Sequence, residues 1–275
     1  MNEEKKSFLA EKARQIRLGA LTAIHSAGAG HPGGALSIAE ILSYLYFEEM
    51  NIDPKDPQKA DRDRFVLSKG HASAALYAVL AERGFFDKSL LPPFRKNGSI
   101  LQGHPDMKHI PGVDMSTGSL GQGISAACGM ALSAKLSDKP FRVYAILGDG
   151  EIEEGQVWEA AMFARHYKLD NLCAFVDFNG LQIDGTVQDV IDPTPIDEKF
   201  AAFGWNVICI DGHDYDQIEN AVNAAKETKD KPTAVIAKTV KGRGVSYMEN
   251  AVDWHGKAPN DEQYAIALSE LGGAD

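Results

Sequence analysis

Arg142-Val143-Tyr144-Ala145-Ile146-Leu147 runs directly into Gly148-Asp149-Gly150, and Leu172-Cys173-Ala174-Phe175-Val176-Asp177-Phe178 runs into Asn179-Gly180. Both apolar runs have the length and composition of buried strands, and each ends at a glycine or an amide. The residues between them, about Glu153–Tyr167, have helical spacing. A strand, a helix and a second strand in this order predict a βαβ unit with parallel strands.

The rest of the second half repeats this alternation. Two further β-like runs, Val207–Ile210 and Ala234–Val240, alternate with expected helices over about Pro195–Phe203 and Tyr215–Lys229. The pattern predicts an α/β fold in which a parallel sheet carries helices on both faces. Ligands of such sheets bind outside the carboxyl ends of the strands.

The first half predicts a layer rich in loops. Helical spacing over Ser7–Ala27 stops at a glycine-rich break, and Ser37 with Glu40 fits a capping box for a second helix. A short apolar run, Phe65–Leu67, precedes an Ala-rich helix that ends near Arg83. With neither an internal repeat nor a low-complexity linker, residues 1–275 are expected to form one domain.

One segment, Ile124–Leu136, consists almost wholly of small and apolar residues. A helix that is apolar all round is normally buried, either in the core or in a subunit interface. Cys128, Cys173 and Cys209 also lie among apolar or small residues, so all three are expected to pack in the core rather than bind a metal or form disulfides.

Composition narrows the class of partner. The formal net charge is −11, with 44% hydrophobic and 24% charged residues. A net negative charge argues against nucleic acid or an anionic membrane as the main partner. No signal segment or membrane-spanning stretch is found, so a cytoplasmic location is expected.

The glycine-flanked carboxylate and the amide suggest a metal site. Gly150 and Asn179 are 29 positions apart (179 − 150), and both end neighbouring expected strands, which would place Asp149 beside Asn179. Carboxylate, amide and carbonyl oxygens suit Mg²⁺, which takes its remaining ligands from phosphates and water. Gly148 and Gly150 leave room for a diphosphate near the backbone, and the helix beginning near Glu153 would point its N-terminus at it. The plainer alternative is a turn at Gly148–Gly150 and a strand-end cap at Asn179, but the combined spacing favours the metal–diphosphate site.

Histidines supply the second chemical signal. Five of the eight are next to a glycine, namely His31, His71, His104, His213 and His255. Imidazole in an accessible loop suits proton movement on hydroxyl groups near neutral pH, although a structural role is an open alternative for each. His213 is expected to be structural, and His25, His109 and His166 have no motif around them.

Five further motifs carry a resemblance to a known family. They are Gly30-His31-Pro32-Gly33-Gly34, Leu67-Ser68-Lys69-Gly70-His71-Ala72, Gln102-Gly103-His104-Pro105, Thr117-Gly118-Ser119-Leu120-Gly121-Gln122-Gly123 and Trp254-His255-Gly256. With Gly148-Asp149-Gly150 and Asn179, this set resembles the transketolases, enzymes that use thiamine diphosphate. The resemblance extends from about Ser7 to Pro259.

The resemblance implies roles for individual residues. Asp149, Asn179 and the carbonyl of Leu181 are similar to the Mg²⁺ ligands, and Ca²⁺ or Mn²⁺ can take the place of Mg²⁺. The residues implied to hold thiamine diphosphate are His71, Gly118, Ser119, Leu120, Gly148, Asp149, Gly150, Glu151, Asn179, Ile183 and His255. The residues implied to act on the substrate are His31, His104 and His255, while Glu154 and Glu159 resemble acids near the cofactor pair or the subunit interface.

Two departures from the family pattern, Lys69 for Asn and Ser119 for Pro, resemble its two-subunit branch. In the family, the glutamate that activates the aminopyrimidine and the residues that bind the sugar phosphate lie on further domains. No counterpart is expected after Pro259. The resemblance therefore implies the N-terminal subunit of a split transketolase, inactive without a C-terminal subunit that carries the pyrimidine-binding and C-terminal domains, with two copies of each.

With that partner, the resemblance implies transfer of a two-carbon ketol unit from a ketose phosphate to an aldose, in carbohydrate metabolism such as the pentose phosphate pathway. Alternatives are a subunit similar to 1-deoxyxylulose-5-phosphate synthase or a 2-oxo-acid dehydrogenase, and a non-catalytic cofactor-binding regulatory protein. The motifs around His104 and His255 count against the first two, and the retained metal pair counts against the third.

Overall fold

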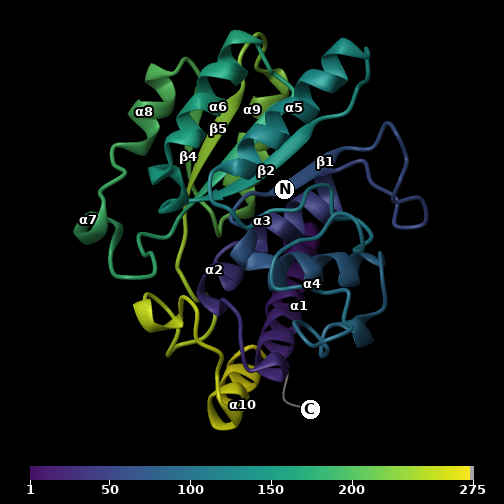
Figure 1. The fold of residues 1–275 in the computed structure, drawn as a ribbon, viewed down its shortest axis with the longest axis vertical. Coiled ribbons are helices and arrows are strands. Elements are labelled where there is room, and N and C mark those ends of the chain that lie inside the picture. The colour runs from purple at the N-terminus through teal and green to yellow at the C-terminus, as the bar shows by residue number, and fades with distance from the viewer. Residues whose placement is uncertain (273–275) are drawn as a thin grey trace.

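A computed structural model describes residues 1–272. Its centre is a five-stranded parallel sheet with the strand order β1-β2-β3-β5-β4 (Figure 1). The strands are β1 (Arg64–Leu67), β2 (Val143–Gly148), β3 (Leu172–Phe178), β4 (Asn206–Asp211) and β5 (Thr233–Lys238). The predicted α/β fold is confirmed, and the short run Phe65–Leu67 proves to be a fifth strand, paired with β2.

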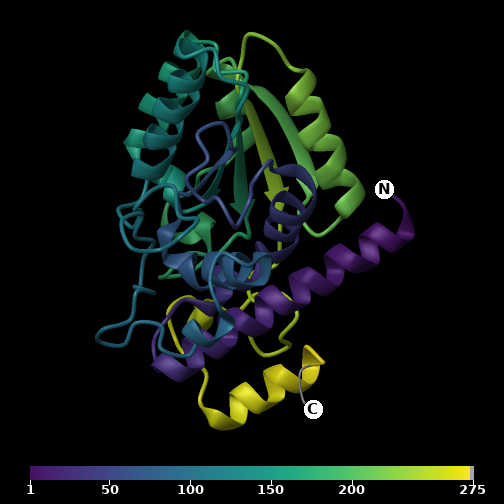
Figure 2. The ribbon, with the colours of Figure 1, turned by 90° about the vertical axis from the view of Figure 1, so that its right-hand side faces the viewer.

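Helices cover both faces of the sheet because side chains along each strand alternate between two cores. In β2, Val143, Ala145 and Leu147 pack with one set of helices, whereas Tyr144 and Ile146 pack with another. The first set comprises α5 (Gln122–Leu136), α6 (Gly155–His166) and α8 (Ile196–Ala202), and the second comprises α1 (Glu3–Ala27), α3 (Ala39–Tyr44), α4 (Ser73–Arg83) and α9 (Tyr215–Glu227). Figure 2 shows the teal helices α5 and α6 opposite the yellow-green helix α9.

The N-terminal layer lies against the second face. The 25-residue helix α1 packs on α3 and α4 and ends at Gly28, whose φ of 64° is a left-handed cap that glycine adopts without strain. Short helices complete this layer and the chain's surface: α2 (Pro32–Leu36), α7 (Val187–Val190) and α10 (Asp261–Glu270), the last of which packs on α1.

The capping box predicted at Ser37 is wrong. Ser37 follows α2, and Ile38 precedes α3 without a side-chain cap. The hydroxyl of Ser37 is fully buried and donates to the carbonyl of Gly34 and to Asp177 Oδ2, at 3.2 and 2.8 Å. A hydrogen bond to a buried carboxylate is charge-assisted, so this tertiary contact sets the position of the Ser37 side chain.

The apolar helix α5 is buried on one face only. Ile124, Ala127, Cys128 and Ala131 lie in the core, whereas Leu136 is 79% exposed.

The prediction that all three cysteines pack in the core is wrong for one of them. Cys209 is exposed because β4 is an edge strand of the sheet. No helix among residues 1–272 is long and apolar enough to cross a membrane.

Candidate functional site

The carboxyl ends of β2 and β3 meet as the sequence predicts. Gly148 is in register with Asp177, so the residues that follow each strand lie side by side. The carboxylate of Asp149 accepts from the backbone N–H of Gly150 at 2.9 Å and from that of Gly180, across the strand boundary, at 2.5 Å. Asp149 is therefore fixed next to Asn179 by backbone hydrogen bonds.

Three oxygen atoms of different kinds gather here. The side-chain NH₂ of Asn179 donates to Asp177 Oδ2 at 2.9 Å. The amide oxygen Asn179 Oδ1 therefore points the other way, and it accepts from the N–H of Leu181 at 3.1 Å. The carbonyl of Leu181 accepts from Lys241 Nζ at 2.7 Å. A carboxylate, an amide oxygen and a carbonyl form a donor set that suits a hard divalent cation.

A cavity of about 260 Å³ opens over these oxygens. Predicted residues that line it are His71, Gly118, Leu120, Gly148, Asp149, Gly150, Glu151, Asn179, Leu181, Ile183 and His255. The sequence interpretation missed Gly34, Lys69, Gln182 and Lys241, which line it as well. The predicted residues His31, His104, Ser119 and Glu154 are not part of this lining.

Three histidines from distant segments meet beside this cavity, and two of them, His71 and His255, line it. The ring centroids of His31, His71 and His255 lie 5.2 to 5.6 Å apart. His104 lies beside Gly118, which lines the cavity, since a Cβ added at Gly118 would lie 3.3 Å from its ring. The fold thus brings together four imidazoles that belong to four separate motifs of the sequence.

Burial and nearby cations keep these imidazoles neutral. Burial, with Arg95 next in effect, lowers the pKa of His31 to about 4. Burial and then Lys241 lower the pKa of His255 to about 3, and burial and then Lys69 place the pKa of His71 well below its usual value. A neutral imidazole offers one donor and one acceptor, which is the pairing that a hydroxyl group requires.

Two buried lysines, Lys69 and Lys241, border the cavity. Lys69 is 1% exposed, and its Nζ donates to Asp177 Oδ2 at 2.5 Å. Asp177 also accepts from Ser37, Thr239 and Asn179. Because an unpaired buried charge is costly, an aspartate inside the apolar run of β3 was a sequence signal that a buried cation lies nearby.

The predicted acids differ in their surroundings. Glu151 is 2% exposed and accepts from Ser68 Oγ and from the N–H groups of Gly121 and Gly148, so it joins three segments of the cavity wall. Burial raises its pKa. Glu154 lies at the start of α6 and is exposed, outside the cavity lining, and its role stays a prediction.

The site fits a diphosphate held through a divalent cation. A Cβ added at Gly34 would lie 3.2 Å from Lys69 Nζ and 3.4 Å from His71 Nε2, so glycine keeps this space free between two cationic or donor groups. Among residues 1–272, no group of three or more His, Cys, Asp or Glu side chains could hold a metal alone. The protein's oxygens would thus form an incomplete set, which a phosphate-bearing cofactor completes.

The electrostatics of Asp149 agree with that fit. Burial, followed by the nearby charge of Asp177, raises the pKa of Asp149 to about 7. A carboxylate held in such a place has an unmet demand for positive charge, which a divalent cation would satisfy.

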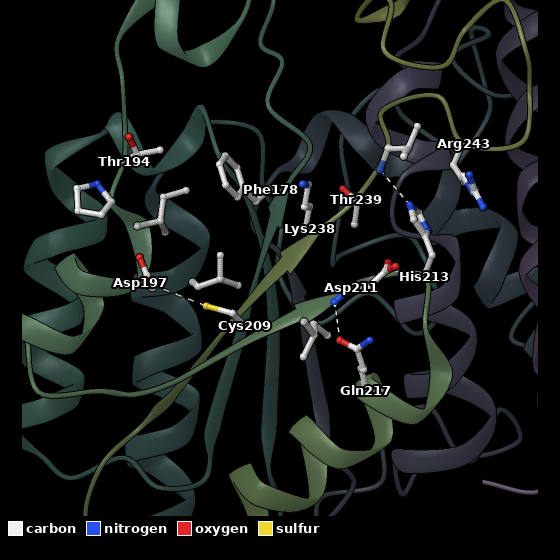
Figure 3. A pocket seen from close by; sticks show the side chains of 15 residues that line it. Phe178, Thr194, Asp197, Cys209, Asp211, His213, Gln217, Lys238, Thr239 and Arg243 are labelled. Atoms are coloured by element: carbon white, nitrogen blue, oxygen red, sulfur yellow. Dashed lines mark hydrogen bonds between the residues drawn. The ribbon is translucent and has the colours of Figure 1, made fainter.

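A larger cavity of about 820 Å³ lies along the same carboxyl edge of the sheet, at the ends of β5 and β4 and beside the start of α8 (Figure 3). Its polar groups are largely bonded within the chain: His213 to Glu40 and Val240, Asp211 to His213 and Gln217, and Thr239 to Asp177. The contacts of His213 confirm its predicted structural role.

The family follows from comparison with known proteins. The family model "Transketolase, thiamine diphosphate binding domain" matches residues 9–274. The fold and site thus define a thiamine-diphosphate-binding protein of the α/β class. The chain belongs to the transketolase family, as its N-terminal, cofactor-binding part.

Relatives of two lengths are similar to the chain. It is 47% identical to a 6-deoxy-6-sulfo-D-fructose transketolase subunit of Clostridium sp. (strain MSTE9), with 98% of each chain covered. It is 42% identical to an apulose-4-phosphate transketolase subunit of Phocaeicola vulgatus, over 90% of this chain and 88% of that one. Crystallised transketolase of Campylobacter jejuni is 36% identical with a TM-score of 0.92, and the match covers 99% of this chain and 43% of that one.

The chain thus spans about two fifths of the single-chain transketolases, and nearly the whole of the two relatives that are named as subunits. The chain is an enzyme subunit of the transferase type. A synthase-like, dehydrogenase-like or purely regulatory protein is not favoured, because the relatives are transketolases.

Proposed function

We propose that the chain is the cofactor-diphosphate half of a split transketolase. With a C-terminal subunit, it would transfer a two-carbon ketol unit from a ketose phosphate to an aldose acceptor. The observation that carries this proposal is that one cavity joins a hard-cation donor set at Asp149, Asn179 and Leu181 to a cluster of neutral histidines.

The donor set would hold Mg²⁺, with Ca²⁺ or Mn²⁺ as substitutes, and through it the diphosphate. His71, Gly150 and the lysine ammonium groups would bind or face the phosphate oxygens, while Gly118, Ser119 and Leu120 would line the thiamine pocket. Ile183, which is 62% exposed, offers an apolar wall for the ring. When bound, thiamine diphosphate supplies an electron sink for cleavage of the carbon–carbon bond, and the protein supplies position and electrostatics.

The histidines would bind and orient the ketose. His31, His104 and His255 are neutral near pH 7, so each can donate to one sugar oxygen or accept a proton from another. We further propose that Glu154, exposed at the start of α6, acts through the partner chain rather than within this cavity.

The partner would supply the glutamate that faces the aminopyrimidine and the residues that bind the sugar phosphate. Two relatives named as subunits support this division, since the chain covers 98% and 88% of their lengths. Large side chains on α6 and at its C-terminal cap are exposed, with Met162 at 55% and Tyr167 at 46%, and α6 packs on α5. We propose that this surface is buried in an assembly with two copies of each subunit, in the cytoplasm.

We also propose that residues 1–275 act as one domain. A single apolar core joins Leu9 and Ile24 of α1 to Tyr144, Phe175 and Val235 of the sheet. The N-terminal layer and the sheet would then unfold together.

Reconstitution with the partner tests the function. The donors should include a ketose phosphate, 6-deoxy-6-sulfo-D-fructose and apulose 4-phosphate, because the two shorter relatives are named for the last two. We expect ketol transfer with both subunits and none with this chain alone. Substantial turnover by this chain, free of partner, would overturn the split-enzyme proposal.

A further inference from the structure

The loop that carries His104 is held to the fold by side chains. Residues 91–121, between the 3₁₀ turn Lys88–Leu90 and α5, form neither helix nor strand. Backbone carbonyls in such a segment have no partners in a helix or sheet, so other donors must satisfy those that are buried. The position of His104 is therefore set by the groups that bond to this loop.

Three consecutive carbonyls of the loop face one side of α4. Ser73 Oγ donates to the carbonyl of Gly103 at 2.8 Å. Tyr77 Oη lies 2.8 and 2.9 Å from the carbonyls of Gln102 and His104. Ser73 and Tyr77 are one helical turn apart, so they lie on the same face of α4. A hydroxyl has one hydrogen, which Tyr77 shares between the two carbonyls that flank Gly103.

Packing fixes the direction of the Tyr77 hydroxyl. The side chain is fully buried, and its ring meets that of Phe94 edge-on, with 5.9 Å between the centroids. Burial, followed by the nearby charge of Asp106, raises the pKa of Tyr77, so its hydroxyl keeps the hydrogen near pH 7. Tyr77 is thus a donor with a fixed position.

Arg95 supports the same loop from its other end. The backbone N–H of Arg95 donates to the carbonyl of Leu101 at 2.9 Å, and its Nη2 lies 3.3 Å from the carbonyl of Gly103. The carbonyl of Gly103 therefore has two donors, whereas among residues 1–272 that of His104 has only Tyr77. Tyr77 is the contact on which the position of His104 depends most.

The helix that carries Tyr77 begins beside the cofactor cavity. The turn Gly70–Ala72, directly before α4, contains His71, which lines the cavity. The ring of His104 lies beside Gly118, another lining residue. One helix therefore fixes the distance between a residue of the cofactor cavity and His104.

We infer that Tyr77, assisted by Ser73, is a positioning residue that holds His104 beside the cavity. Its hydroxyl contacts the backbone carbonyl of His104, so it acts on the imidazole by placing it. The role toward a ketose rests on the proposed function, whereas the anchoring of the loop does not.

The anchoring can be measured on the full chain without cofactor or partner. Tyr77→Phe removes the hydroxyl and keeps the ring. Hydrogen exchange is followed by mass spectrometry in peptides that cover residues 95–106. We expect exchange at least about 5-fold faster than in wild type, because loss of a buried hydrogen bond makes local opening easier.

Two controls separate local from global effects. Peptides from β3 should exchange as in wild type, and so should the loop in Tyr215→Phe, which loses a buried hydroxyl bonded to Ser43. Wild-type exchange of the loop in Tyr77→Phe would overturn the inference. If that variant does not fold, wild-type exchange in Ser73→Ala would overturn it.

A second test asks whether Tyr77 acts through His104. On the reconstituted enzyme, with the most active of the three donors, we expect Tyr77→Phe to lower kcat/KM about 10-fold, since misplacing a functional group is costly. In the His104→Ala background the same change should lower kcat/KM less than about 2-fold, because the residue through which Tyr77 acts is gone. Equal factors in both backgrounds would overturn the positioning role.

Cofactor binding distinguishes this role from a general disturbance of α4. Calorimetry should give the assembled Tyr77→Phe enzyme the wild-type affinity for thiamine diphosphate with Mg²⁺. A loss of affinity that matches the loss of kcat/KM would show that the variant displaces His71, and would overturn the assignment. An inactive wild-type pair would instead refute the proposed function, and hydrogen exchange alone would decide whether Tyr77 holds the loop.

Discussion

The ion pair between Arg17 of α1 and Glu40 of α3 supports the segment that carries Lys241. Arg17 Nη2 lies 2.6 and 2.8 Å from the two carboxylate oxygens of Glu40, and Glu40 in turn accepts from His213, which holds the N–H of Val240. Burial by itself would raise the pKa of Glu40, but the charge of Arg17 and the hydrogen bond from His213 outweigh it and lower the pKa to about 2.

This depression gives a magnitude and a pH window. A fall from the usual 4.5 to about 2 corresponds to roughly 3 kcal/mol, because one pKa unit is worth about 1.4 kcal/mol. Since the folded-state pKa is the lower one, the stabilisation is fully present above about pH 4.5 and is lost as the pH falls toward 2. About half of it should remain at pH 3.

The assay is urea unfolding of wild type and Glu40→Gln at pH 6 and pH 3. The variant removes the charge and keeps the size of the side chain. The difference in unfolding free energy between the two proteins should shrink by roughly 2 kcal/mol between pH 6 and pH 3. Glu4→Gln, on the exposed first turn of α1, is the control and should show no such change. A difference that is the same at both pH values would refute the reasoning.

Three further predictions concern the cavity. Asp149→Ala should weaken binding of thiamine diphosphate with Mg²⁺ by several kcal/mol in calorimetry of the assembled enzyme, as loss of a buried charged partner does; equal affinity would exclude this site. His104→Ala should lower kcat/KM for the ketose and leave cofactor affinity nearly intact. The control His109→Ala, at the surface, should change neither kcat/KM nor cofactor affinity. A collapse of cofactor affinity in His104→Ala would contradict the substrate role. Gly34→Ala should leave the free energy of unfolding in urea within about 1 kcal/mol of wild type but weaken cofactor binding at least about tenfold, since the new methyl group fills space beside His71. Unchanged affinity would show that the cofactor does not use this space.

Sequence alone was sufficient where the physical cause is local. Strands β2 to β5 follow from short apolar runs and the helices between them from their spacing, because both periodicities act over a few residues. The site at Asp149 and Asn179 was also predictable, since parallel strands in one sheet end at the same edge. The strand β1 was only a short apolar run until pairing with β2 gave it a partner.

Local rules failed where a distant contact or the position of a strand in the sheet decided the surroundings of a side chain. Ser37 was expected to cap a helix, but its hydroxyl goes to Asp177, 140 positions away in the sequence. Cys209 has the neighbours of a core residue, yet the position of β4 at the sheet edge exposes it.

The sequence by itself determined the fold class, the position of Asp149 beside Asn179 at one edge of the sheet, and the histidines that we propose act with this pair. Only the tertiary structure decided that Lys69 pairs with Asp177 and that Lys241 joins Leu181 to His255. The physical reason is that a charge is stable inside a protein only beside its partner. Which residues become partners depends on how the crossovers pack against the sheet, and no spacing along the chain records that arrangement.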